Sequence, residues 1–404
     1  MGLFKKEFFI SLKSLTYWLV VVFIGVFIFS QLGTDLTSFK EPQPNEDNYG
    51  VGVTNDKISI QKQTMGNLFY QYDVGQYNTY PLGFLKVVTP SNSDQKEIGK
   101  IIEKATGISL EEISEISEKE NKSANEFQMY AHQDFDYFPI AQDYSFQQFQ
   151  EDMKKVVKII GHGSDFEEAK YKASAIKSLS YEEAHENFEM ILKRDKVSGA
   201  YARLVCDYLG IILALVPVFL AATVILRDKR AQSQLVIYTK AISSVKLQTM
   251  RFLSTVVLIF IPVLLFSIMP ALQANLIAQK FNQSGDIWLF YQYILGWTLP
   301  SIIAVVGISF LITTLFGGIT SVMVQVAIWF ISISVGSTNI VGKVGFNLIP
   351  RFNNVGSTVI FEGIYQELVV NRILWACIGI LCFFVSVIVY DYKRKGGKIF
   401  GKSR

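Results

Sequence analysis

The sequence predicts an α-helical polytopic membrane protein with six transmembrane helices and an inserted mixed α/β extracytoplasmic domain. Half of the residues are hydrophobic, and they are concentrated in a run near the N-terminus and in residues 201–390. The block between them, residues 33–199, holds 28 acidic and 18 basic residues, a net charge of −10. This uneven distribution is typical of apolar spans combined with a water-facing domain.

Six runs are apolar and long enough to cross a hydrocarbon core, which needs about 20 helical residues. They lie at residues 15–32, 201–226, 252–272, within 287–316, 319–335 and 373–390. Gly317 and Gly318 predict a tight turn between the fourth and fifth runs. Pro217 and Pro300 lie inside runs, which spans tolerate where neighbouring groups satisfy the freed carbonyls.

Basic residues predict the orientation of the spans. Lys and Arg cluster in residues 1–13, 227–251 and 391–404, each beside an apolar run. Such clusters are typical of the cytoplasmic side, so six spans place both termini there and the acidic block outside. Because each cluster adjoins a span, we expect lipid headgroups rather than nucleic acid as its neighbours. The composition, rich in Lys, Ile, Asn and Phe, favours the cell membrane of a low-GC Gram-positive bacterium.

The predicted organisation therefore has five parts. Residues 1–14 form a cytoplasmic amphipathic helix, 15–32 the first span, 33–200 the extracytoplasmic domain, 201–390 spans two to six, and 391–404 a cytoplasmic basic tail. A secretory signal peptide is the alternative interpretation of residues 1–32. The apolar run is long for a signal peptide and no small-residue cleavage site follows, so we predict an uncleaved anchor.

The extracytoplasmic block contains no cysteine and must fold on its own core. Its patterns predict strands at residues 48–60, 64–72 and 82–88, and helices at 94–106, 146–160 and 166–193, the last opened by a capping box of Ser164 and Glu167. The chain's three histidines are His132, His162 and His185. Glu182, His185, Glu186 and Glu189 resemble half of a di-metal site, but no second copy exists, so we predict a solvated helix face, with neither a metal site nor a catalytic site.

Two charged residues lie within the second predicted span. Arg203 and Asp207 are one helical turn apart near its outer end, so we expect them to form an intramembrane ion pair. Ionisable groups inside a membrane are candidates for function by default. A pair that neutralises itself favours a structural role over a substrate site.

The cytoplasmic loop at residues 227–251 is the most informative segment for function. An apolar stretch at residues 234–239 lies between charged flanks, which favours a helix that docks into a partner over one that lies at the lipid interface. The sequence has no Gly-rich phosphate-binding loop, so energy has to come from a partner or an ion gradient.

This layout resembles the permease subunits of type-2 ABC exporters, also called type V exporters. An amphipathic start, a first span, a large external insertion, five further spans and a charged loop between spans two and three occur in the same order. The loop is similar to that family's ATPase-coupling segment, with Ala241 in place of the usual proline. The resemblance implies that the ATPase-coupling residues are Arg227, Asp228, Gln234, Leu235, Val236, Ile237, Tyr238, Thr239 and Lys240.

The resemblance implies a permease without enzymatic activity or cofactors of its own. Cytoplasmic ABC ATPase subunits would bind ATP and Mg, and a second permease, identical or homologous, would complete the pore. It also implies an external re-entrant segment at residues 336–372, with short helices within 346–372 that include the amphipathic stretch 359–370. The exported substrate could be a peptide, a lipid, a drug or an ion. The alternatives are a membrane sensor or scaffold whose external domain binds a peptide or envelope ligand, a gradient-driven carrier, and, least favoured, a membrane enzyme.

Overall fold

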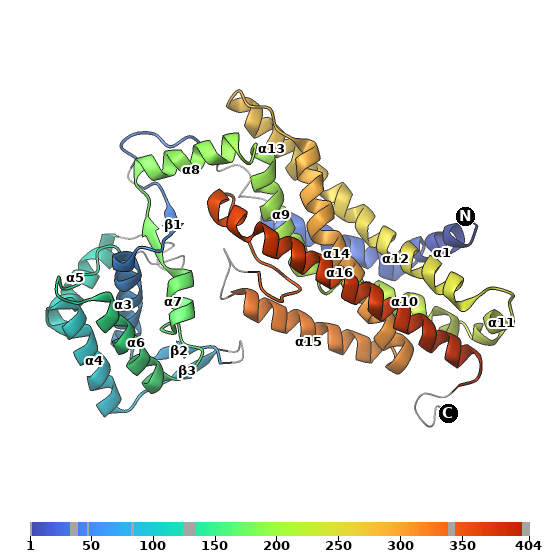
Figure 1. Ribbon diagram of the computed structural model, residues 1–404, viewed down its shortest axis with the longest axis horizontal. Helices are drawn as coiled ribbons and strands as arrows, with labels where there is room; N and C mark the ends of the chain where they lie inside the picture. Colours follow the sequence, from blue (N-terminus) through green and yellow to red (C-terminus); the bar gives the residue numbers. More distant parts are fainter. Residues whose placement is uncertain are drawn as a thin grey trace. The chain divides into compact units, whose positions relative to one another are not determined.

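The computed structural model describes residues 2–32, 39–46, 48–81, 85–123, 135–337 and 344–397. The chain is mostly helical, at 72%, and divides into two compact units. The helical unit consists of Met1–Lys40, Glu189–Gly336 and Ile340–Arg404, and the α/β unit consists mainly of Glu41–Phe188. Figure 1 labels the elements of both units.

The helical unit contains the apolar helices. In the described part of the chain, five helices are long and apolar enough to cross a membrane, or six if the bent pair α9–α10 counts as one span. Each of the six predicted runs lies in one of these helices or helix pairs. The elements are α1 (Gly2–Leu12), α2 (Leu15–Leu32), α9 (Ser198–Leu213), α10 (Pro217–Arg230), α11 (Gln234–Tyr238), α12 (Ser244–Phe266), α13 (Ile268–Lys280), α14 (Ile287–Phe316), α15 (Gly318–Ser337) and α16 (Thr358–Arg394).

The second predicted span is broken where Pro217 begins α10, and α9 and α10 meet at an angle of 42°. A proline cannot donate a backbone hydrogen bond, and the break leaves nearby carbonyl groups to be satisfied from elsewhere. Side chains of α15 supply the donors. The amide of Gln325 donates to the carbonyl of Ala214 at 2.6 Å, and the indole of Trp329 donates to that of Ile211 at 2.9 Å. The break is therefore stabilised by hydrogen bonds from α15.

The turn predicted at two glycines is confirmed. Helix α14 ends at Phe316, Gly317 follows with a φ of 106°, and α15 begins at Gly318. A residue with a side chain rarely adopts such a φ, so glycine suits this position.

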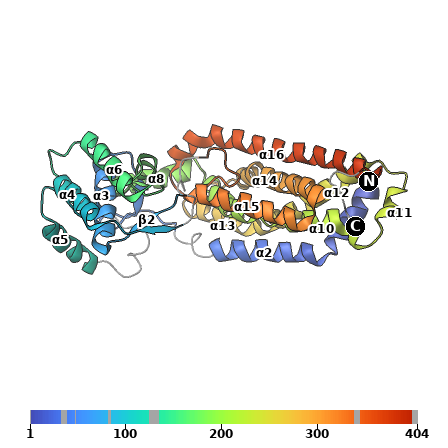
Figure 2. The same ribbon diagram turned by 90° about the horizontal axis from the view of Figure 1, so that it is seen from below.

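The last helix is longer than the sequence predicted. Helix α16 runs without a break through 37 residues, about 55 Å at 1.5 Å per residue. The amphipathic stretch at residues 359–370 does not form a separate short helix, because it is part of the first turns of α16. Figure 2 shows α2 and α16 along opposite sides of the helical unit.

Helices α14 and α16 cross at two glycines. A Cβ atom added to Gly307 would lie 2.0 Å from the carbonyl oxygen of Gly379, and one added to Gly379 would lie 2.4 Å from that of Ile303. Small residues let helix backbones approach closely, which is how membrane helices gain packing energy without a hydrophobic driving force.

The α/β unit is built from helices with two small antiparallel sheets. Strand β1 (Val51–Val53) pairs with β4 (Ile176–Ser178), and β2 (Tyr77–Thr79) pairs with β3 (Lys86–Val88). Buried side chains such as Met65, Leu68, Ile98, Ile102 and Phe149 form its core. The helices are α3 (Lys57–Val74), α4 (Asn92–Thr106), α5 (Leu110–Ser123), α6 (Phe146–Ile160), α7 (Glu168–Ser174) and α8 (Tyr181–Lys193), whose last residues belong to the helical unit.

The helices predicted near residues 94–106 and 146–160 are confirmed, but the strand at 64–72 is wrong. Residues 64–72 belong to α3, which Asp56 caps at its start and Gly75, with a φ of 71°, ends. Met65, Leu68 and Phe69 are buried at helical spacing. Only Val51–Val53 of the strand predicted at 48–60 forms a strand. Of the third predicted strand, Lys86–Val88 forms β3, and residues 82–84 lie outside the described residues.

The long helix predicted at residues 166–193 is also wrong. The region divides into α7, β4 and α8, because residues 176–178 pair with β1 instead of continuing the helix. Ser164 does not cap a helix: it forms a β-bridge with Thr79, and Glu167 stands at the start of α7 without a side-chain cap. Strand pairing across the unit overrides the local capping signal here.

Candidate coupling surface and buried charges

Helix α11 presents apolar side chains to the surface. It joins α10 to α12 at the same end of the helical unit as α1 and the C-terminal end of α16 (Figure 1). Leu235 and Val236 are 77% and 58% exposed, whereas Ile237 and Tyr238 are partly buried. Of the predicted coupling residues, Leu235 and Val236 therefore have the geometry of a docking surface.

The end of α16 holds α11 in place. The guanidinium of Arg394 donates to the carbonyl oxygens of Tyr238 at 3.0 Å and of Lys240 at 2.7 Å, and also to that of Ile242. The ring of Tyr238 meets that of Tyr390 edge to face, with centroids 5.9 Å apart. These bonds join the C-terminal end of α11 and the turn that follows it to α16. Arg394 was predicted only as part of a basic tail. Every residue has a backbone carbonyl, so the sequence does not show which carbonyls an arginine contacts.

Arg227 and Asp228 belong to a buried charge cluster rather than to the exposed surface. Asp228 accepts a hydrogen bond from Arg251 at 2.6 Å, Arg227 pairs with Glu7, and Arg251 also approaches Glu7 at 3.5 Å. The cluster ties α1, α10 and α12 together, and the side chains of Glu7 and Arg251 are 7% and 2% exposed. Its alternating charges compensate one another, which a buried ion needs. Sequence reasoning missed Glu7 and Arg251.

The side chains of Gln234 and Thr239 form hydrogen bonds within α11 and its C-terminal end. Gln234 donates to the hydroxyl of Tyr238, and the hydroxyl of Thr239 donates to the carbonyl of Val236 at 2.9 Å. Lys240 contributes its carbonyl to Arg394 and its side chain is exposed.

The predicted Arg203–Asp207 ion pair is wrong. Arg203 pairs with Asp195 through two bonds of 2.6 Å, and its guanidinium lies over the ring of Phe361 at 4.6 Å. Asp207 accepts bonds from the Arg351 side chain at 2.9 Å and from the Phe352 amide at 2.6 Å.

The reason is geometric. Side chains on a helix lean toward its N-terminus, which directs Arg203 to Asp195, three residues before α9 begins. The segment that precedes α16 supplies partners to Asp207. Both residues are fully buried, so each needs a partner of opposite charge.

The histidine and glutamate residues of α8 do not converge on an ion. Within the described residues, no group of three or more His, Cys, Asp or Glu side chains could hold a metal. The ring of His185 is stacked between those of Tyr181 and Phe188, at 5.8 and 6.3 Å. His162 approaches Glu167 at 3.2 Å on the surface, and His132 lies outside the described residues.

Comparison of the chain with protein-family models, with curated proteins and with solved structures gives no match. The function therefore has to be inferred from the geometry of the helical unit.

Proposed function

We propose that the chain is the membrane-spanning permease subunit of an ATP-driven exporter of the type-2 ABC class. It would act with separate cytoplasmic ATPase subunits and with a second permease, identical or homologous. The observation that carries this proposal is α11, a short helix that exposes Leu235 and Val236 while Arg394 holds its backbone. An exposed apolar helix held by fixed contacts suits a surface that receives a partner.

The contacts of α11 provide a mechanical path from a docked ATPase to the spans. Helix α11 continues into α10 and α12 through short turns, and Arg394 links it to α16. The Asp228–Arg251 bond then makes the ends of α10 and α12 move together. A push on α11 would therefore tilt three spans at once, and α10 could rotate about the break at Pro217.

In this proposal the membrane is the cell membrane of a bacterium, and both termini and α11 face the cytoplasm. The α/β unit would then lie outside the cell. The basic residues Lys229, Arg230, Lys393 and Arg394 at the α11 end of the helical unit support this orientation. The exported substrate would be a peptide, a lipid, a drug or an ion.

Co-purification tests the docking surface. The tagged chain should be purified from its native membranes, and we expect an ATP-binding protein to co-purify with it as a complex that hydrolyses ATP, whereas the chain alone should not. Leu235→Asp and Val236→Asp should each release the ATPase, because a charge would replace a buried apolar contact. Leu85→Asp, on the α/β unit, is the matched control, since Leu85 is as exposed as Val236 at 58%.

Two results would change the proposal. If Leu235→Asp, Val236→Asp and the Leu85→Asp control all retain the ATPase, α11 is not the docking surface. If the complex forms and hydrolyses ATP only when an external peptide binds, and moves no substrate in vesicles, the sensor alternative is favoured.

A further inference from the structure

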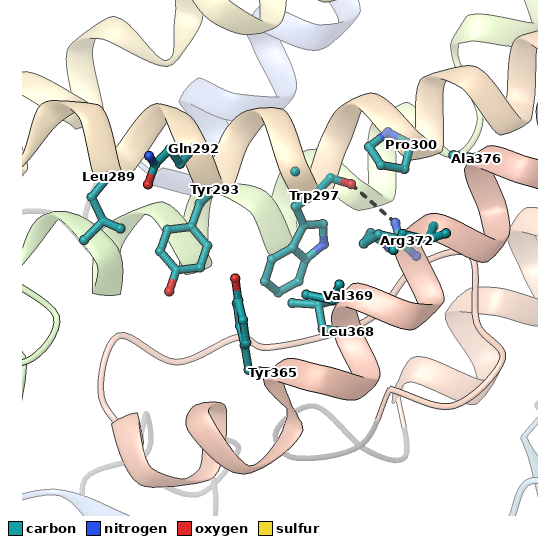
Figure 3. Close-up of a pocket in the computed structure, with 12 residues that line it drawn as sticks. Leu289, Gln292, Tyr293, Trp297, Pro300, Tyr365, Leu368, Val369, Arg372 and Ala376 are labelled. Carbon is teal, nitrogen blue, oxygen red and sulfur yellow. Dashed lines mark hydrogen bonds between the residues drawn. The ribbon is translucent and has the colours of Figure 1, made fainter.

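A pocket of about 400 Å³ lies between α14 and α16 in the helical unit (Figure 3). Residues 289–300 of α14 form one wall and 365–376 of α16 form the other. The rings of Tyr293 and Tyr365 extend from opposite helices into the space between them. The volume is within the range of small-molecule sites, about 300–1,000 Å³.

Arg372 brings a buried positive charge to this pocket. Its side chain is 4% exposed, and it donates to Ser301 at 2.8 Å and to the carbonyls of Leu348 and Asn347 at 3.1 and 3.2 Å. It also donates to the side chain of Asn371. All the partners that the described residues supply to it are neutral. Its hydrogen bonds are satisfied, but its charge is not compensated.

The two other fully buried arginines of the helical unit differ in this respect. Arg203 faces Asp195 and Arg251 faces Asp228, each at 2.6 Å. A buried charge is costly unless an opposite charge accompanies it, and the cost is highest among apolar spans. The uncompensated Arg372 therefore favours an anion in the adjoining pocket.

Trp297 adds a donor without an acceptor. Its indole is 3% exposed and lines the same pocket, and among the described residues its Nε1 has no hydrogen-bond partner. Figure 3 shows the indole nitrogen on the side of the ring nearest Arg372. A buried donor without an acceptor costs free energy, which a ligand oxygen would recover. The charge and the donor thus point to the same chemical group.

Apart from Gln292 and the two tyrosines, the rest of the wall is apolar. Leu289, Pro300, Leu368, Val369, Ile373 and Ala376 line the pocket. We propose that the pocket binds an amphiphile with an anionic head, a carboxylate or a phosphate. The head lies at Arg372 and Trp297, and the chain follows the apolar wall. This site goes beyond the exporter proposal, because it requires no ATPase at α11.

Quenching of tryptophan fluorescence tests the proposal in the purified full-length chain in a neutral detergent. Dibromostearate carries a carboxylate head and a quenching chain, and its methyl ester has the same chain with a neutral head. Dibromostearate should quench Trp297 saturably, and the ester should bind about tenfold or more weakly, because it lacks the charge that pairs with Arg372. Trp297→Phe identifies the signal by removing that part of the quenching.

A variant that fills the pocket separates binding from folding. Gly296 lines the pocket, and a Cβ added there would meet no atom within 4 Å, so Gly296→Leu should fill the pocket and leave the bonds of Arg372 intact. Dibromostearate should then bind about tenfold or more weakly. Gly363→Leu is the matched control: Gly363 lies on α16, also faces open space, and does not line the pocket.

Brominated lipids identify the source of the amphiphile. In nanodiscs, quenching of Trp297 by brominated phosphatidylglycerol but not by brominated phosphatidylcholine would assign the site to a bilayer lipid. Quenching by dibromostearate alone would assign it to a free amphiphile. Equal affinity for acid and ester, no effect of Gly296→Leu, or no quenching of Trp297 by any anionic probe would overturn the proposal.

Discussion

Arg203 of α9 pairs with Asp195, eight residues earlier, through two hydrogen bonds of 2.6 Å. Thr358, the first residue of α16, donates to the same carboxylate at 2.7 Å. The pair therefore joins the start of α9 to the start of α16. Because Arg203 is fully buried, loss of Asp195 would leave a buried charge without a partner.

A double-mutant cycle distinguishes this pair from the one that the sequence suggested. Arg203→Met and Asp195→Asn should show a coupling free energy of about 1–3 kcal/mol, because they remove the same ion pair. The cycle of Arg203→Met with Asp207→Asn should give a coupling below about 0.5 kcal/mol. The free energy of unfolding can be measured in detergent by denaturant titration. A larger coupling to Asp207 would contradict the observed pairing.

The contrast shows which features a sequence can predict. The positions of the long apolar helices follow from the length of the apolar runs. The ends of α4, α6 and α14 follow from the glycine after each helix, Gly107, Gly161 and Gly317. Both signals are local. The partners of buried charges are set by the tertiary fold. Glu7 and Arg251 are separated by 244 positions, and no local pattern relates them.

The misassigned strand at residues 64–72 has a similar origin. Its Phe and Tyr residues favour strands, and this preference depends on the packing surface that a residue meets. The decisive signals lay outside the segment, at the Asp56 cap and at Gly75. In the candidate coupling surface, the exposure of Leu235 agreed with the sequence prediction, whereas the role of Arg394 depended on carbonyl groups that only the fold positions.

The close contact of α14 and α16 predicts that Gly307 cannot carry a side chain. Gly307→Ala would place a Cβ 2.0 Å from a backbone oxygen, so the helices must separate, and we expect a loss of about 1–3 kcal/mol. Gly296→Ala, on the same helix, meets no atom within 4 Å and should be neutral or stabilising by up to about 1 kcal/mol. Thermal unfolding in detergent measures both. Equal stability of the two variants would show that the helices do not cross at this glycine.

The proposed topology predicts opposite labelling of the two units. In a background lacking Cys206, Cys377 and Cys382, a cysteine at Lys229 should react with a membrane-impermeant maleimide only after the cells are opened. A cysteine at Glu115 should react in intact cells, because the α/β unit is proposed to lie outside. Both positions are exposed on the protein surface, so the side of the membrane on which each one lies decides whether it reacts. Labelling of both from one side would contradict the six-span arrangement.

Asp152 predicts the acid sensitivity of the α/β unit. Its side chain is 1% exposed and pairs with Lys104 and Lys155, each at 2.7 Å. Burial alone would raise the pKa of this carboxyl, but the hydrogen bonds from the two lysines outweigh it, and the pKa lies below its usual value. The folded state therefore favours the ionised form. The stabilisation is complete above the unfolded pKa of about 3.9 and is lost as the pH falls through the folded pKa.

Asp152→Asn should consequently destabilise the unit at pH 7 by about 1.5–3 kcal/mol, the range for hydrogen bonds to charged groups. The difference from the unchanged protein should shrink at acidic pH, where Asp152 itself becomes neutral. Hydrogen exchange of peptides from α4 and α6 measures the effect locally. Asp143→Asn changes an exposed carboxylate close by and serves as the control. If the Asp152→Asn difference stays constant down to the pH at which the carboxyl is protonated, Asp152 does not stabilise the unit through its charge.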